Sequence, residues 1–542
     1  MKHCLLIAIW LIAITGNAQT IGLLQHEANS LDWGYVLFAP VTGNTTYLID
    51  KCGRQVKGWS SAYKPGQSVS LLPDGTLLHT GISNNSTFLS GGKGGVIEKI
   101  DWNGAVLWQY NVSDATKCQH HDAKALPNGN VLVIAWESKT NTEAIAAGRN
   151  PALVPATLWS EQILELQPVG TNGANVVWEW HLWDHLVQDF DNTKANYDTV
   201  SKHPELVNLN FNSSATNSDW IHLNAIDYNP DLDQILISSH AFSEIWVIDH
   251  STTAAEAATH SGGHSGKGGD LLYRWGNPQA YNNGAAANKK FFGQHNAHWI
   301  ETGLPHAGAI MVFNNGLNRP GGNYSTVEIL QPPVSGTGYS SALPYGPAAT
   351  AILYNAGNPN NFYAQNISGA QQLSNGNVLI CDGPAGTFFE IDSQQQPVWK
   401  YIDPVSISGV MAQNSSPSQN LVFRCTFYPE TYSAFSGHNL AAGSIIEDVN
   451  PVSAACTLTT GVATEAISQI HIYPNPATAR WSIELPENAA ALKVYDVTGK
   501  LLWQQFQTRS TSIDASGWTQ GFYFLTVKNA AGIITTYRLI KK

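Results

Sequence analysis

The sequence predicts an all-β fold of many short strands, and composition, hairpin turns and a recurring strand pattern all favour it. Only 13% of the 542 residues are charged, whereas 47 are glycine, 18 tryptophan and 20 tyrosine. Aromatic residues favour strands, and glycine favours the tight turns between them. Asp74-Gly75, Asn128-Gly129 and Asn375-Gly376 each separate two apolar runs, which is typical of β-hairpins whose turns need positive φ.

Three strand types recur in the same order along the chain. A strand ending in an acidic or polar turn occurs six times, at residues 47–50, 97–101, 163–166, 245–249, 327–329 and 389–392. A strand centred on an aromatic residue usually follows this first type, as at 56–59, 106–110, 177–180, 272–275 and 398–401. A hairpin turn that leads into an apolar strand comes next and is clearest at 72–78, 126–132 and 373–379. Small sheets repeated radially protect their edges and enclose a channel. The pattern predicts a six-bladed β-propeller over residues 19–456, with units at about 34–80, 96–137, 160–239, 243–316, 325–383 and 387–450; irregular β-sandwiches are the alternative.

Two segments interrupt the repeat. Residues 183–217 have helix-compatible spacing and are expected to form an excursion over one face. Residues 250–269, rich in Ser, Thr, Ala, Gly and His, are expected to form a mobile loop. Long loops on a rigid scaffold often carry function, although simple surface decoration is an equal alternative for each.

The N-terminus has the pattern of a secretory signal peptide over residues 1–18. Lys2 and His3 precede an apolar run from Leu5 to Ile14, and small residues follow at Gly16 and Ala18. We expect an exported chain without a transmembrane segment in its mature form. Five cysteines remain, with no zinc-type Cys-x-x-Cys spacing, so at most two disulfides can form and their pairing stays open.

The composition changes after Cys456. Residues 457–468 are predicted to be a linker, and residues 469–542 a small C-terminal β-sandwich of short alternating strands. Tyr473-Pro474-Asn475-Pro476, residues 494–500 and Gly521-Phe522-Tyr523 give this region a strong resemblance to the type A sorting domain of type IX secretion. The resemblance implies a Bacteroidetes-type cargo that the type IX machinery carries to the cell surface or beyond, with the tail cleaved or kept as an anchor.

The net charge of −12 argues against nucleic acid as a partner, because no basic stripe is available to neutralise phosphates. Local arginines could still hold a small anion.

One position of the repeat gathers histidines. If inner strands of a propeller meet at its channel, residues at one repeat phase face each other, and aligning the turns brings together His121, His222, His295, Ser368 and Arg424. The register at His121 is ambiguous by one residue because His120 precedes it. Imidazoles and a guanidinium suit binding and chemistry on an anion. Capping or packing roles remain open for each histidine, as does a three-histidine zinc or copper site.

Further motifs resemble the arylsulfotransferase family of bacterial secreted propellers over about residues 34–440. They lie at residues 219–224, 243–250, 269–278, 294–299 and 313–316, with Arg319 close behind. The resemblance implies sulfuryl transfer from a phenolic sulfate ester to a phenol through a sulfated histidine, with no cofactor and no nucleotide sulfate donor.

Carried over residue by residue, the resemblance makes His222 and His295 the assisting catalytic histidines and Arg319 the sulfate clamp. His121, Asn296, Ser368 and Arg424 are expected to contact the substrate. The family's transferring histidine has no counterpart, because residues 366–371 offer Ser368 in its place, and a serine sulfate would be a stable ester. Another histidine could take the role, the acceptor could attack directly, or the protein could be a silent propeller that binds sulfated or phenolic ligands.

Overall fold

The protein is described by a computed structural model, which places residues 20–335, 338–358, 361–447, 456, 471–496, 500–528 and 534–542. The chain divides into two compact units, Met1–Cys456 and Thr457–Lys542. The predicted signal peptide (1–18) and linker (457–468) lie outside the described residues. The all-β class is confirmed, since the α-helices of the described part are the two short segments α1 (Asn141–Ala146) and α2 (Ala254–Ala257).

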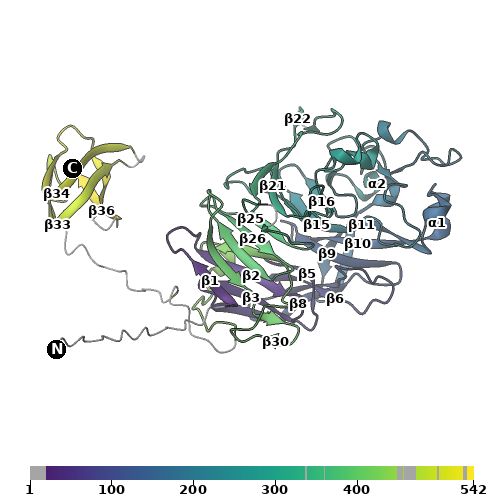
Figure 1. Ribbon diagram of the computed structural model, residues 1–542, viewed down its shortest axis with the longest axis horizontal. Helices are drawn as coiled ribbons and strands as arrows, with labels where there is room; N and C mark the ends of the chain where they lie inside the picture. The colour runs from purple at the N-terminus through teal and green to yellow at the C-terminus, as the bar shows by residue number, and fades with distance from the viewer. Residues whose placement is uncertain are drawn as a thin grey trace, which may run out of the picture. The chain divides into compact units, whose positions relative to one another are not determined.

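The first unit contains, within its described residues, six antiparallel sheets of four or five strands. One edge strand of each sheet, here called the inner strand, contacts the inner strands of two other sheets. The inner strands are β5 (Pro65–Leu71), β9 (Lys117–Ala125), β15 (Leu223–Asn229), β19 (His295–Trp299), β25 (Gly369–Gln372) and β31 (Val422–Pro429). β31 pairs with β2 (Gly34–Pro40), so a strand from the end of the unit completes a sheet that early strands begin. Figure 1 labels β2 beside its other partner in that sheet, β3 (Thr45–Asp50).

The recurring strands predicted from sequence occupy fixed places in these sheets. The second strands are β2 (Gly34–Pro40), β6 (Leu77–Ile82), β10 (Val131–Thr140), β16 (Gln234–Ser239), β20 (Ile310–Asn314) and β26 (Val378–Asp382). The acidic-ended strands are third, in β3 (Thr45–Asp50), β7 (Gly95–Ile100), β11 (Thr157–Val169), β17 (Glu244–Asp249), β21 (Thr326–Leu330) and β27 (Thr387–Ile391). The fourth strands are β4 (Gln55–Ser60), β8 (Val106–Asn111), β12 (Gly173–His181), β18 (Tyr273–Trp275), β24 (Ala351–Tyr354) and β28 (Pro397–Ile402), with β1 (Gly22–His26) added beyond β28.

The predicted unit boundaries are wrong by about two strands. Each predicted unit groups a third strand with the hairpin that follows it, whereas that hairpin opens the next sheet. The hairpin turns themselves are correctly placed between inner and second strands. Gly75, for example, has φ +84° between β5 and β6, where Leu72 N donates to Thr76 O at 2.8 Å.

The two inserted segments differ from their predictions. Residues 183–217 contain no α-helix; they form 3-10 turns at Leu182–Asp184 and Val200–Lys202 and a parallel pair of β13 (Leu186–Val187) with β14 (Val207–Asn208). Helix-like spacing failed here because backbone groups bond to partners farther along the same segment, as in Val207 N to His185 O at 2.8 Å and Leu209 N to Val187 O at 2.9 Å. Residues 250–269 include α2, whose N-terminus is closed by a capping box of Thr253 and Glu256.

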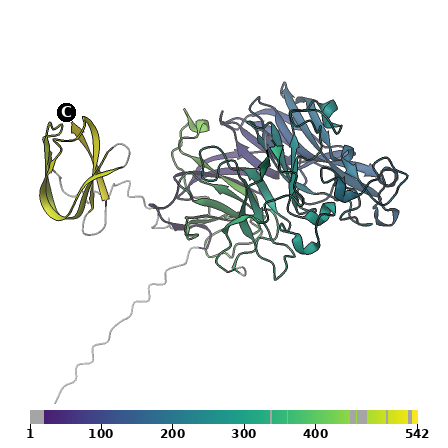
Figure 2. The same ribbon diagram turned by 90° about the horizontal axis from the view of Figure 1, so that it is seen from above.

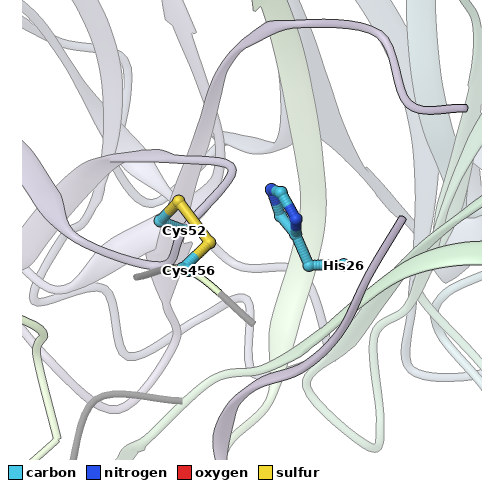
Figure 3. Close-up of side chains that lie close together, drawn as sticks. All are labelled: His26, Cys52 and Cys456. Atoms are coloured by element: carbon cyan, nitrogen blue, oxygen red, sulfur yellow. A yellow bond between two sulfur atoms is a disulfide. The ribbon is translucent and has the colours of Figure 1, made fainter. Parts of the chain in front are cut away.

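One disulfide joins the turn after β3 to the end of the first unit. Cys52 and Cys456 are bonded, and the His26 ring lies beside them (Figure 3). Cys118, Cys381 and Cys425 are free and buried, so two of the five described cysteines pair.

The second unit is a five-stranded antiparallel sheet of β32 (His471–Tyr473), β33 (Arg480–Tyr495), β34 (Leu501–Asp514), β35 (Gly521–Lys528) and β36 (Ile534–Lys541). Figure 2 shows its long strands curving around the interior, where Trp481, Val494 and Leu525 are fully buried. Asn475 of the Tyr-Pro-Asn-Pro motif donates to Arg538 O and accepts from Ile540 N, both at 2.8 Å. The motif therefore fastens the last strand.

Candidate functional site

Four histidines gather at a cavity of about 430 Å³ formed where the inner strands begin. The cavity is lined by Val41, Gln67, Gly91, Gly92, His121, His222, His240, His295, Leu317, Gln365, Asn366, Ile367 and Leu421. Three of the histidines are those predicted from the repeat phase. The fourth, His240, lies in the turn between β16 and β17 and was not predicted, because it is outside that phase.

The four imidazoles form a row. Ring centroids are 4.7 Å apart for His121 and His222, 5.2 Å for His222 and His240, and 5.5 Å for His240 and His295. A ligand in the cavity therefore meets several ring nitrogens at once.

A shared backbone conformation underlies the predicted phase. Gln67, His121, His222, Asn296 and Ser368 all have positive φ, with values of +106°, +52°, +53°, +51° and +83°. Non-glycine residues rarely adopt this region, and such strain clusters at functional sites. In β9 the residue with this conformation is His121, so His121 and not His120 occupies the predicted repeat phase. In β19 the equivalent residue is Asn296, one place after His295.

His222 is coupled to a carboxylate. Its Nδ1 lies 2.6 Å from Asp219 Oδ2, and Asp219 Oδ1 accepts a hydrogen bond from Trp136 Nε1 at 3.1 Å. Burial disfavours the imidazolium, but attraction to Asp219 outweighs burial and raises the pKa of His222 above its ordinary value. Because a carboxylate accepts only, Nδ1 carries a proton and Nε2 is the nitrogen left for the cavity.

His295 has the opposite character. Its Nδ1 is 2.8 Å from Asn315 Oδ1 and 3.1 Å from Gly293 O, and Asn315 Nδ2 donates to the carbonyls of Ala364 and Ile367. These two donations fix the Asn315 amide with its oxygen toward His295, so Nδ1 is the protonated nitrogen. Burial lowers the pKa of His295 to about 4. At neutral pH, Nε2 is therefore unprotonated and carries a lone pair.

His121 ends a buried chain of polar groups. Its Nδ1 is 2.8 Å from His120 Nδ1, and His120 Nε2 is 2.8 Å from Glu161 Oε2. The His120 ring stacks on Trp136 at 4.0 Å between centroids. Burial lowers the pKa of His120 to about 3 and raises that of Glu161 well above its usual range. Burial and the neighbouring His222 lower the pKa of His121.

The His240 ring is the least constrained of the four by hydrogen bonds. No side-chain hydrogen bond to its ring is present among the described residues, and burial followed by repulsion from His222 lowers its pKa. A Cβ on Gly293 would lie 2.9 Å from the His240 ring, so the close packing of this ring needs glycine there.

A comparison with protein families decides the classification. The family model described as "Arylsulfotransferase (ASST)" matches residues 35–424, which is most of the chain. This chain belongs to the arylsulfotransferase family. The model "Secretion system C-terminal sorting domain" matches residues 471–542, which implies export to the cell surface or the medium and suggests an interaction with the type IX machinery. None of the described helices is long and apolar enough to span a bilayer.

No curated protein matches the chain. Several solved structures have a distant likeness to it. A protein of unknown function from Bacteroides caccae shares 13% identity at a TM-score of 0.38, covering 74% of this chain and 100% of its own. The Cps50 (Swd1) β-propeller domain from Myceliophteria thermophila shares 10% at 0.33, covering 71% and 87%. A putative 6-phosphogluconolactonase from Bacteroides fragilis also shares 10% at 0.33, covering 73% and 98%.

In this arylsulfotransferase-family chain, neither predicted arginine is among the residues that line the cavity. Arg319 Nη2 donates to Thr326 Oγ1 at 3.0 Å and lies 3.7 Å from Glu328 Oε1, and its guanidinium covers the Tyr324 ring at 4.1 Å. Arg424 forms a bidentate pair with Asp122 of β9. Each guanidinium has a carboxylate beside it, although Arg319 Nε is buried without a hydrogen bond among the described residues.

Asn296 and Ser368 also turn away from the cavity of this family member. Asn296 Oδ1 accepts from Ala370 N at 3.0 Å. The Ser368 hydroxyl donates to Asn366 O at 3.1 Å and accepts from Gly383 N at 3.0 Å. The structure thus brings His121, His222 and His295 together, whereas Asn296, Ser368, Arg319 and Arg424 are in the surrounding framework.

Proposed function

We propose that this secreted member of the arylsulfotransferase family forms a closed six-bladed propeller and transfers a sulfuryl group from a phenolic sulfate ester to a phenol at the histidine cavity. The signal peptide and sorting domain would export it from a Bacteroidetes-type cell. The observation that carries the proposal is the fixed tautomer of His295, whose neutral Nε2 faces a cavity shared with a protonatable His222.

The other two imidazoles supply hydrogen-bond donors. His222 is an imidazolium below its raised pKa and offers Nε2–H. The raised pKa of Glu161 keeps that carboxyl protonated, so it donates to His120 Nε2. His120 Nδ1–H then donates to His121 Nδ1, which leaves the His121 proton on Nε2. The N–H donors of His222 and His121 can bind the oxygens of a sulfate ester, and the lone pair of His295 Nε2 can attack its sulfur.

The reaction follows from these roles. The lone pair of His295 Nε2 forms a bond to sulfur, and the bond from sulfur to the phenolic oxygen breaks. The departing phenolate takes the Nε2 proton of His222. In the second half, His222 accepts the proton of an incoming phenol, whose oxygen attacks the sulfur and releases neutral His295. An N-sulfated imidazole is a good leaving group, so Ser368 need not react.

The test uses the purified secreted chain with an aryl sulfate. Without acceptor, we expect one sulfuryl group on His295, located by peptide mass spectrometry. His295→Gln should lower transfer by at least about 10³-fold, because the nucleophile is lost. His264→Gln, an exposed change outside the cavity, is the control and should keep wild-type activity. A sulfated residue other than His295, or full activity of His295→Gln, would contradict the proposed nucleophile.

A silent binding role is the second candidate, and Ser368 together with the two engaged arginines favours it. In that case calorimetry would detect aryl sulfate binding, with neither transfer nor hydrolysis under conditions in which another family member turns over. Transfer by the wild-type chain would exclude this role.

A further inference from the structure

A second group of metal-ligand side chains joins the two inserted segments of the first unit. His185 follows the 3-10 turn at Leu182–Asp184, His260 follows α2, and Asp270 lies just before β18. One potential ligand atom from each lies within 4.8 Å of the others. None of the three lines the histidine cavity.

Both imidazoles lie within hydrogen-bond distance of the same carboxylate oxygen. His185 Nδ1 is 2.8 Å and His260 Nδ1 2.7 Å from Asp270 Oδ1. The His185 side chain is completely buried, Asp270 is 8% exposed and His260 is 61% exposed. The group therefore opens to solvent on the His260 side only.

The hydrogen bonds of His185 fix its tautomer. Its Nε2 is 2.8 Å from the carbonyl oxygen of Ala257, which can only accept, so Nε2 carries the proton. In a neutral ring, Nδ1 then directs a lone pair at the Asp270 carboxylate. Two lone pairs at 2.8 Å repel each other unless a positive charge lies between them. A divalent cation would meet this need and would also satisfy His260 Nδ1.

The surroundings of His185 match those of a metal-binding histidine. Such residues almost always donate the second ring N–H to a carbonyl or carboxylate, which orients the ring. Here Ala257 O takes that role, and the ring stacks on Trp180 at 5.6 Å with an interplanar angle of 4°. Trp180 Nε1 in turn donates to Gly269 O at 2.7 Å, next to Asp270.

We propose that His185 Nδ1, His260 Nδ1 and Asp270 Oδ1 bind one Zn²⁺, with water completing the tetrahedron on the exposed side. Two imidazoles and one carboxylate are a borderline donor set that suits zinc better than the hard cations Ca²⁺ and Mg²⁺. Ligand atoms on a tetrahedral zinc are roughly 3.3 Å apart. Both hydrogen-bonded pairs would therefore have to open by a few tenths of an ångström, which requires the exposed His260 ring to move and the Asp270 carboxylate to turn.

The ion would cross-link the two inserted segments. His185 belongs to the first segment, residues 183–217, whereas His260 lies in the second, residues 250–269, and Asp270 directly follows it. A backbone hydrogen bond from Leu271 N to Glu205 O at 2.9 Å already links the first segment to the residue that follows Asp270. Zinc therefore stabilises the folded state and takes no part in sulfuryl transfer, so its test is independent of the proposed function.

The test is metal binding by the whole secreted chain after treatment with a chelator. Elemental analysis after zinc reloading should give one ion per chain, and zinc should raise the Tm, because binding to the folded state alone stabilises it. Competition with a chromophoric chelator then measures affinity. His260→Ala, an exposed substitution that leaves the core intact, should weaken zinc at least about tenfold and abolish the Tm shift.

His264→Ala, in the same segment and exposed, is the matched control and should bind zinc as the wild type does. Absence of stoichiometric zinc in the wild type, or equal affinity in wild type and His260→Ala, would overturn the proposal. The first result would leave a protonated His185–Asp270 pair, and the second would place the ion elsewhere, such as among the cavity histidines.

Discussion

Two halves of the cavity region use one backbone conformation for opposite purposes. On β9 and immediately before β15, the residues with positive φ are His121 and His222, whose rings line the cavity. On β19 and immediately before β25, the equivalent residues are Asn296 and Ser368, whose side chains bond to the backbone instead. The left-handed position is thus a feature of the scaffold, and only some sheets use it for a functional side chain.

The cavity has four histidines even though Ser368 stands where the family resemblance implies another. His295 reaches the cavity from the position before Asn296, and His240 reaches it from a turn. A left-handed non-glycine residue costs about 1–2 kcal/mol. At His222 the Asp219 contact offsets this cost, whereas at Ser368 the two backbone hydrogen bonds do so.

Among changes that separate the two halves, removing the Asp219 carboxylate beside His222 should have the greatest effect. Wild-type kcat/KM should rise as His295 loses its proton, near pH 4 with its pKa of about 4, and fall as pH rises through the raised pKa of His222. Asp219→Asn should move the alkaline limb to lower pH, because the attraction that stabilises the imidazolium is gone. The loss at neutral pH should be on the order of 10²-fold.

Rates measured across pH with a single aryl sulfate, at low donor concentration, check this prediction. Circular dichroism should show that Asp219→Asn is folded. An alkaline limb that stays in place would remove His222 from the proton transfer.

A pair of glycine substitutions tests the two halves against each other. A Cβ on Gly92 would lie 1.9 Å from His121 Cε1, and one on Gly369 would lie 2.5 Å from Asn296 Oδ1. Gly92→Ala should displace the His121 ring and weaken aryl sulfate binding at least about tenfold, or about 1.4 kcal/mol. Gly369→Ala should lower stability by about 1–3 kcal/mol, with binding unchanged.

Calorimetric titration of both variants, with urea unfolding beside it, separates the two effects. Equal loss of binding in Gly92→Ala and Gly369→Ala would show that the two halves do not differ in function.

Local patterns made part of this molecule predictable. Asp74-Gly75 predicts a hairpin because only a few residue types accept the positive φ of its turn. Because the strands are short, residues such as Gln67 and His121 lie at a regular spacing before these hairpin turns. This phase predicts positions for His121 and His222 that the structure places at the cavity. His240 carried no such signal, because a turn has no repeat phase.

Long-range pairing made the rest unpredictable. Arg424 looked available from sequence, but its partner Asp122 lies 302 positions away on β9. Arg319 is a local exception, because Thr326 and Glu328 of β21 engage it although they lie only a few positions farther along the chain. The segment 183–217 has helical spacing, yet hydrogen bonds such as Val207 N to His185 O hold it in another form.

The smallest expected effect concerns Ser368 itself. Ser368→Ala removes a hydroxyl that is buried, donates to Asn366 O and accepts from Gly383 N. The unpaired Gly383 N–H should cost about 1–3 kcal/mol in the free energy of unfolding. Sulfuryl transfer should stay within about twofold of wild type, because Ser368 is not among the residues that line the cavity. Urea denaturation together with the transfer assay measures both quantities. A large loss of transfer at unchanged stability would instead identify Ser368 as a reacting group, at the position where the family resemblance implies the nucleophile.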